Sequence, residues 1–191
     1  MKQYLIIGNS AAGVSAVEAI RKDDKSSKII IVSDEEGPAY CRCLISYHLA
    51  GDVKADKMLY RPESFYRENN VQLISNKKVT GIDVKKNLVT CADNSQLNYN
   101  SLLISTGASA IVPDVKGIKQ KGVFVFRAIN DAKGIEAFLS GVKTACVLGG
   151  GLVGLKAAYA LRKRNLDVKI IVKSKQILSQ MLDNIAAGLV Q

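Results

Sequence analysis

The stretch YLIIGNSAAGVSAVEAIRKDDKSSKIIIV, residues 4–32, decides the fold class. Its first apolar run, 4–7, ends at Gly8 and predicts a short buried strand. From Gly13 onward the apolar residues recur at helical spacing, and the run 28–32 predicts a second buried strand. The stretch therefore predicts a strand, a glycine-rich turn, a helix and another strand.

The same design returns near the end of the chain. VLGGGLVGLKAAYALRKRNLDVKIIV, residues 147–172, places Gly149 and Gly154 141 positions after Gly8 and Gly13. Alternating strands and helices with this spacing are typical of parallel α/β sheets. We therefore predict an α/β fold with two Rossmann-like dinucleotide-binding lobes.

Both copies carry a glycine pattern with a physical purpose. In a dinucleotide-binding turn the first glycine permits the bend, the second lets the backbone approach the pyrophosphate, and the third lets helix and strand pack. The second copy, GGGLVG, is complete, whereas the first has Ser10 at the middle glycine. One such pattern is weak evidence, because any tight strand-to-helix turn favours glycine. Two in the right context predict two nucleotide sites.

The residues that end the second strand of each copy differ. Asp34 follows Gly13 by 21 positions, where a carboxylate accepts hydrogen bonds from ribose hydroxyls, and Glu35 is the alternative. The corresponding end of the second copy, VKSKQ, contains Lys173 and no carboxylate. Lysines favour a ribose 2′-phosphate, so the pattern favours NADPH over NADH; ordinary solvated lysines are the alternative.

The rest of the chain predicts short elements. We expect short helices at 43–50 and 62–68, a longer one at 130–140, a hairpin turn at 86–87, a linker at 108–117, and strands at 71–74, 78–84, 88–91, 102–105 and 144–148.

Bulk properties narrow the class of protein. The net charge of +10 is spread over scattered lysines, without a basic helix interleaved with aromatics, so nucleic acid is not an expected partner. No apolar run reaches the length of a membrane span, and the apolar part of MKQYLIIGNS is too short for a signal peptide. We therefore expect a cytoplasmic protein without a membrane partner, whose four cysteines are reduced.

With these features in place, the chain resembles the FAD- and NAD(P)H-dependent pyridine nucleotide–disulfide oxidoreductases, closest to the branch of rubredoxin reductases, nitrite reductase flavoproteins and NADH oxidases. The motifs that carry the resemblance are GNSAAG, SDEEGPAYCR, RPESFYRENNV, YNSLLISTGA, IVPDVKG, FRAINDA and GGGLVG. The resemblance implies three-layer ββα lobes: an FAD-binding domain at 1–110 and an NAD(P)H-binding domain at 111–191. Both are expected to be incomplete, because the family pattern continues further. The chain is then a piece, a split gene product that needs a partner chain, or a remnant.

The resemblance also implies site residues. The FAD pyrophosphate turn comprises Gly8, Ser10, Ala11, Ala12 and Gly13, with Asp34 or Glu35 on the ribose. Further FAD contacts fall on Arg42, Val79, Thr106, Gly107 and Arg127. NAD(P)H is assigned to Gly149, Gly151, Gly154 and Lys173. At Ala11, peroxidase and oxidase members have a histidine, so peroxide chemistry is not expected.

The stretch AYCRCLISYH holds two of the cysteines. Cys43 lies eight residues before Gly51, the position of the redox cysteine in single-cysteine family members; the rubredoxin-reductase branch has a proline there. A helix N-terminus and Arg42 would lower the pKa of its thiol, and Cys41 would resolve an oxidised Cys43. The alternative is that both are small residues in the flavin wall. CxC has no second ligand pair, so no metal is expected.

Together these features predict a flavoprotein that passes hydride from NAD(P)H to FAD and on to a disulfide, a thiol-linked species or a small redox protein. The rival hypothesis is a non-catalytic nucleotide-binding or electron-transfer subunit that works only with a partner chain. A homo-oligomer is a further expectation.

Overall fold

The computed structural model describes residues 2–191 and divides into two compact units. Unit 1 comprises the chain up to Cys41 together with Leu59–Ala108. Unit 2 comprises Ser109–Gln191 together with Arg42–Met58, which we call the cysteine segment. The units are defined by backbone contacts and not by cofactors, so the cofactor domains at 1–110 and 111–191 stay a prediction.

The centre of unit 1 is a parallel sheet in the order β3-β2-β1-β7. Its strands are β1 Gln3–Ile7, β2 Lys28–Val32, β3 Val71–Ile74 and β7 Ser101–Ile104. Helix α1, Ala11–Asp23, connects β1 to β2, and the short helix α3, Phe65–Glu68, precedes β3. A second, antiparallel sheet consists of β4 Val79–Asp83, β5 Leu88–Cys91 and β6 Gln96–Asn98.

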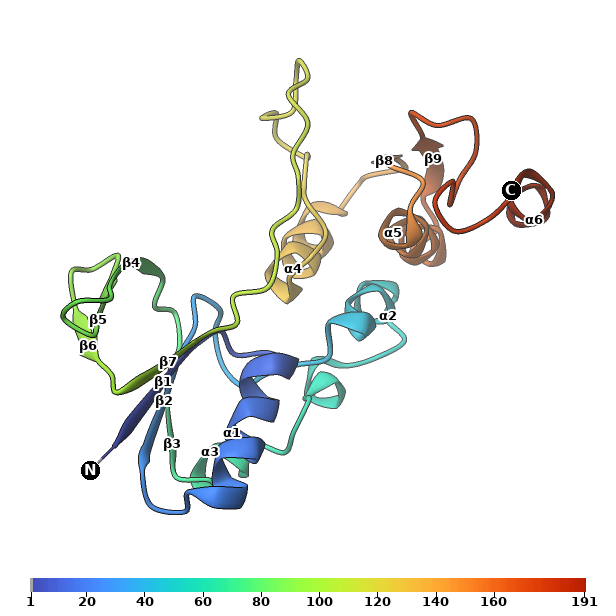
Figure 1. The fold of residues 1–191 in the computed structure, drawn as a ribbon. Coiled ribbons are helices and arrows are strands. Elements are labelled where there is room, and N and C mark those ends of the chain that lie inside the picture. Colours follow the sequence, from blue (N-terminus) through green and yellow to red (C-terminus); the bar gives the residue numbers. More distant parts are fainter. Residues whose placement is uncertain (1) are drawn as a thin grey trace. The chain divides into compact units, whose positions relative to one another are not determined.

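Unit 1 has three layers because its central strands bury both faces. On one face Leu5 and Ile7 of β1 form a cluster with Val89 and Cys91 of the second sheet. On the other face Ile6 of β1 packs with helical residues of α1 and with α3. Figure 1 shows α1 and α3 on one side of the parallel sheet and β4–β6 on the other. Apolar runs without alternation are typical of such two-sided strands, and the predicted ββα arrangement is confirmed here.

A buried arginine ties the end of α1 to the connection between α3 and β3. Arg21 is only 8% exposed. Its guanidinium donates to the carbonyl oxygens of Asn69 (2.7 Å), Asp24 (2.9 Å) and Asn70 (3.2 Å). These bonds satisfy the donors of the buried guanidinium, which loses its hydration on folding and would otherwise lack hydrogen-bond partners.

Unit 2 repeats the strand–turn–helix–strand pattern. Its elements are α4 Ile129–Phe138, β8 Thr144–Leu148, α5 Leu152–Lys163, β9 Asp167–Ile171 and α6 Asn184–Val190. Strands β8 and β9 pair in parallel, and α5 packs on them. The opposite face of this pair carries Leu148 and Ile171, which are 56% and 57% exposed.

The cysteine segment packs on α5 and α4. It contains the 3-10 turn η1 Arg42–Leu44, helix α2 Ile45–Ala50 and the 3-10 turn η2 Ala55–Met58. Three basic residues hold the cysteine segment: Lys156 and Lys163 of α5, and Arg164, the C-cap residue of α5. Arg164 Nε donates to the Leu49 carbonyl at 2.7 Å, Lys156 Nζ to the Tyr47 hydroxyl at 2.7 Å, and Lys163 Nζ to Asp52 at 2.5 Å. The hydrogen bond to Asp52 raises the pKa of Lys163.

The predicted helix at 62–68 is shorter in the structure. Pro62 lies before α3, and its carbonyl accepts from the Phe65 amide at 2.9 Å in a turn. Strand β6 and helix α6 were not predicted, because three residues are too few to show alternation and the weakly amphipathic NIAAGLV gives no clear helical period. No helix in the described part of the chain, residues 2–191, is long and apolar enough to cross a bilayer.

Candidate functional site

The first glycine turn leaves no room for side chains at its two glycines. Gly8 has φ +113°, and a Cβ there would lie 2.3 Å from the Ser105 carbonyl oxygen. A Cβ on Gly13 would lie 2.1 Å from the Gly8 carbonyl oxygen. Between them, Ser10 is the N-cap of α1, and Ala11 and Ala12 are exposed. The turn therefore presents the amino end of α1 without bulky side chains, which suits a pyrophosphate.

The second turn reproduces this geometry. Gly149 has φ +114°, and a Cβ on Gly154 would lie 2.1 Å from the Gly149 carbonyl oxygen. The Gly149 amide donates to the Ile171 carbonyl at 2.8 Å, as the Gly8 amide does to the second strand of its own copy, also at 2.8 Å. A Cβ on Gly151 would meet nothing within 4 Å. The space beside Gly151, the N-cap residue of α5, is therefore open to a phosphate group, and we call this space the Gly151 cradle.

The first turn lies where the order of the parallel strands reverses. The chain runs from β1 outward to β2 and β3, and then β7 pairs with the other side of β1. Ser105, just after β7, donates from Oγ to the Ile7 carbonyl at 3.0 Å. Thr106 and Gly107 follow directly, and both are exposed. Ligands of open α/β sheets bind at this kind of switch point.

The acidic candidates lie at the same edge of unit 1. Asp34 is exposed, whereas Glu35 is half-buried and its carboxylate accepts a hydrogen bond from the Tyr40 hydroxyl. The Glu35 carbonyl accepts from the Asn76 amide at 3.2 Å. This contact brings the connection between β3 and β4, and with it Val79 at the start of β4, to the acidic loop.

The cysteines differ in environment, and all four are free thiols. Cys43, in η1, and Cys146, in β8, are exposed; Cys41 is half-buried and Cys91 is buried. Helix α2 ends at Gly51, whose φ of +86° favours glycine. The glycine end expected for this helix, eight residues after Cys43, is therefore confirmed.

Two arginines predicted as flavin contacts lie together in unit 2. Arg42 Nη1 donates to the Arg127 carbonyl at 3.4 Å. The Arg127 amide donates to Asp131 Oδ2 at 2.8 Å, at the start of α4. Arg42 of the cysteine segment is thus held beside the FRAINDA motif.

Sequence reasoning missed two residues at the carboxyl edge of the parallel sheet of unit 1. Asn9 and Tyr66 lie inside motifs that we quoted, but neither received a role. Tyr66 OH donates to Asn9 Oδ1 at 2.8 Å, and Asn9 Nδ2 donates to the Gly37 carbonyl at 3.1 Å. The signal was present only as a polar residue in each motif, and it did not reveal the pairing.

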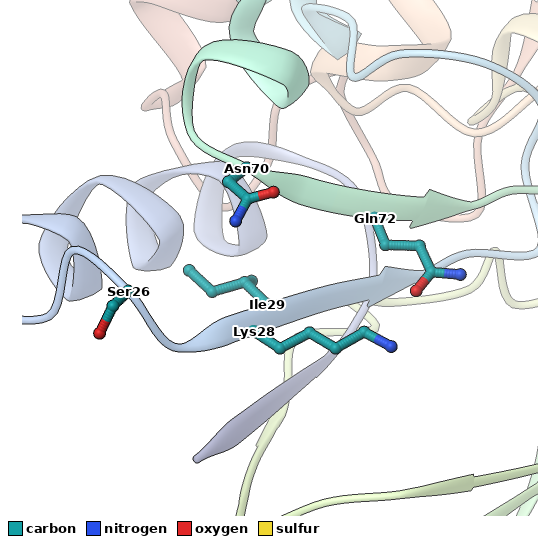
Figure 2. A pocket seen from close by; sticks show the side chains of 5 residues that line it. All are labelled: Ser26, Lys28, Ile29, Asn70 and Gln72. Atoms are coloured by element: carbon teal, nitrogen blue, oxygen red, sulfur yellow. The ribbon is translucent and has the colours of Figure 1, made fainter. Parts of the chain in front are cut away.

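A hollow of about 340 Å³ is lined by Ser26, Lys28, Ile29, Asn70 and Gln72. Figure 2 shows these five side chains around β2 and β3. The hollow lies at the amino ends of β2 and β3, whereas the glycine turn lies at the carboxyl end of β1. It is therefore not part of the candidate site. Within residues 2–191, no three His, Cys, Asp or Glu side chains are grouped as metal ligands.

Comparison with known proteins identifies the family and the fold. The family model for pyridine nucleotide-disulphide oxidoreductase matches residues 2–191. A NADH oxidase of Methanocaldococcus jannaschii is 34% identical over 98% of this chain and 44% of its own length.

Two solved structures share the fold. The NAD-dependent persulfide reductase from A. fulgidus superposes with a TM-score of 0.90 and 28% identity, over 98% of this chain and 37% of that one. The NADH:rubredoxin oxidoreductase from Clostridium acetobutylicum has a TM-score of 0.88 and 25% identity, over 98% and 49% of the respective chains. The chain thus spans less than half the length of these three proteins.

Proposed function

The chain belongs to the pyridine nucleotide-disulphide oxidoreductase family, and from this premise we propose that it is the dinucleotide-binding portion of a flavoprotein oxidoreductase. In this role NAD(P)H would supply hydride to FAD, and the reduced flavin would pass electrons on to a disulfide, a thiol-linked species or a small redox protein. The observation that carries the proposal is the pair of glycine turns with the same geometry, one in each unit.

The residues of the two turns fit the phosphates of two dinucleotides. The first turn, with Asp34 or Glu35 on the adenosine ribose, takes FAD, and the cradle at Gly151 takes NAD(P)H. When bound, the flavin supplies hydride acceptance and onward electron transfer. The chain itself would supply position: backbone amides for the phosphates and a carboxylate for the ribose.

The visible spectrum of the purified chain tests the cofactor assignment. We expect a yellow protein, or a chain that gains flavin absorbance on incubation with FAD and is bleached by NADPH or NADH without oxygen. A chain that takes up no FAD, alone or with the remaining part of the fold supplied, contradicts the proposal. Asp34→Ala and Glu35→Ala, compared separately, show which carboxylate holds the ribose.

Cys43 is the proposed thiol in the onward transfer. It is exposed, which allows contact with an acceptor. Reductive titration of the flavin-loaded form, first oxidised with hydrogen peroxide, should then take up four electrons per flavin. Two reduce the flavin, and two reduce either a Cys43 sulfenate to thiol and water or a Cys41–Cys43 disulfide to two thiols. Cys43→Ser should lower the uptake to two, and Cys41→Ser shows whether Cys41 resolves that oxidised state. Uptake of two electrons by the unsubstituted protein removes Cys43 from the mechanism.

We further propose NADPH as the preferred nucleotide. Lys173 is exposed just beyond β9, and the following strand-end residues contain no carboxylate before Asp183. A lysine stabilises a 2′-phosphate, whereas a bare diol gains nothing from it. Lys173→Ala should therefore weaken NADPH binding several-fold and leave NADH binding unchanged. Equal effects on the affinities for both nucleotides contradict the preference.

The second candidate is an electron-transfer subunit that requires a partner chain. The exposed apolar face of the β8–β9 pair favours it, because parallel sheets are ordinarily covered on both faces. This view predicts co-purification with a second polypeptide and no NAD(P)H oxidation without it. A homo-oligomer would instead cover that face with a second copy. A cytoplasmic location belongs to either proposal, since four free thiols suit a reducing compartment.

A further inference from the structure

A hydrogen-bonded bridge joins the first glycine turn to the loop after β2. Asn9 Nδ2 donates to the Gly37 carbonyl at 3.1 Å, and Asn9 Oδ1 accepts from the Tyr66 hydroxyl at 2.8 Å. The same hydroxyl accepts from the Ala39 amide at 2.8 Å. We call these contacts the Asn9–Tyr66 bridge. They connect three segments of unit 1 that are far apart in the sequence.

The loop held by this bridge is the one that carries the acidic candidates. Asp34 and Glu35 lie at its start, and Gly37 and Ala39 follow. Asn9 comes directly after Gly8, at the point where the turn begins. Because Asn9 belongs to the glycine turn, the bridge holds the acidic loop directly against that turn.

The position of the bridge distinguishes it from ordinary packing. The aromatic ring of Tyr66 packs edge-on against Phe65, with ring centroids 5.4 Å apart, and borders the apolar cluster under α1. A phenylalanine would serve that contact equally well. The hydroxyl instead binds one backbone amide and one side-chain amide at the carboxyl edge of the sheet, where a ligand of this fold binds.

One ligand fragment spans the two features that the bridge joins. In an adenosine diphosphate group the pyrophosphate contacts the glycine turn, and the ribose, a few bonds away, meets the carboxylate. Both contacts form together only if turn and loop keep one spacing. When the loop is held before the ligand arrives, binding does not bear the cost of ordering it.

We propose that Asn9 and Tyr66 are positioning residues for the adenosine diphosphate half of the dinucleotide in unit 1, an inference that rests on the proposed function. They set the distance between the pyrophosphate turn and the ribose carboxylate without touching the flavin. Tyr66 acts through its hydroxyl, and Asn9 acts through both atoms of its side-chain amide.

Calorimetric titration with ADP and with 2′-deoxy-ADP tests this proposal. The titrations use the chain with Gly151→Asp, which places a carboxylate in the open cradle of unit 2 and so restricts binding to unit 1. That chain should prefer ADP, because only ADP offers the 2′-hydroxyl. Tyr66→Phe should weaken ADP binding about tenfold, which corresponds to about 1.4 kcal/mol. It should also bring the ratio of the affinities for ADP and 2′-deoxy-ADP close to one.

Tyr4→Phe is the matched control. It also removes one hydroxyl from unit 1, where Tyr4 OH donates to Asp24 Oδ2 at 3.2 Å, at the opposite end of the sheet. It should lower the melting temperature, by less than Tyr66→Phe because one hydrogen bond is lost instead of two, and should leave the ratio of affinities unchanged. Asn9→Ala should act as Tyr66→Phe does.

The outcomes separate the two claims. If Tyr66→Phe keeps both the ADP affinity and the preference over 2′-deoxy-ADP, the bridge is only structural and the inference is overturned, while the proposed function stands. If Tyr4→Phe also abolishes the preference, the loss reflects general destabilisation and the inference is overturned as well. If the parent chain binds neither nucleotide, the proposed function fails and this inference fails with it.

Discussion

The neighbouring glycines Gly150 and Gly151 should respond in opposite ways to the same substitution. A Cβ on Gly150 would lie 2.3 Å from Val172 Cγ1 and 3.3 Å from the Ile177 Cα. A Cβ on Gly151 would meet nothing within 4 Å. Alanine therefore tests packing at the first position and access for a phosphate at the second.

The expected cost of Gly150→Ala follows from overpacking. The gap of 2.3 Å falls about 1 Å short of an ordinary contact, and a β-branched valine cannot move its methyl group alone. Such insertions cost typically about 1–3 kcal/mol. Because about 1 kcal/mol shifts the melting temperature of a domain of up to about 100 residues by roughly 4–8 °C, unit 2 should melt about 10 °C lower.

The expected cost of Gly151→Ala falls on binding instead. Gly151 has φ −79° and ψ 176°, a conformation that alanine adopts without strain, so stability should change by no more than about 0.5 kcal/mol. The methyl group holds a phosphate oxygen away from the backbone amide. The loss of one hydrogen bond to a charged group, about 1.5–3 kcal/mol, weakens NADH binding by about 10-fold to 150-fold.

Thermal melting by circular dichroism and NADH titration in excess FAD measure the two effects. Gly151→Ala should melt like the unsubstituted chain and bind NADH poorly, whereas Gly150→Ala should show the lower melting temperature. If Gly151→Ala binds NADH normally, no pyrophosphate enters this cradle. If both variants melt at the same lowered temperature, a side chain at position 151 meets neighbouring atoms, which contradicts an open space beside Gly151.

Three further outcomes follow from single contacts. Arg21→Met leaves three backbone carbonyls without their donor and should lower the free energy of unfolding in urea by about 3 kcal/mol, whereas the exposed Lys22→Met should change it by less than about 0.5 kcal/mol. Hydrogen bonds from Ser27 lower the pKa of Asp24 from its ordinary value of 3.8 to about 2, so the stabilising contribution of its carboxylate is complete above the ordinary pKa and disappears as the pH falls through about 2. The difference in melting temperature between the unsubstituted chain and Asp24→Asn should accordingly vanish near pH 2; a difference independent of pH contradicts it. Arg164→Ala removes a donor to the cysteine segment and should speed amide exchange there about tenfold in mass spectrometry, without affecting unit 1.

The glycine turns were predictable because their constraints are local. The steric contact that demands glycine at position 13 is with the carbonyl of Gly8, five residues earlier, and the second copy repeats the same spacing. Likewise the central strands could be located because burial on both faces requires unbroken apolar runs, as in 28–32. Composition, period and spacing contain this information directly.

The tertiary structure alone decided which distant residues meet. Tyr66 lies 57 positions from Asn9, and Arg164 lies 115 positions from Leu49, the helix carbonyl that it holds. The assignment of the cysteine segment to unit 2 also depends on such contacts. A single polar side chain gives no period and no spacing, and its partner is chosen only when the packed strands and helices bring two segments to one place. For that reason the sequence by itself located the two glycine turns, whereas the bridge that holds the first turn to its acidic loop became visible only in three dimensions.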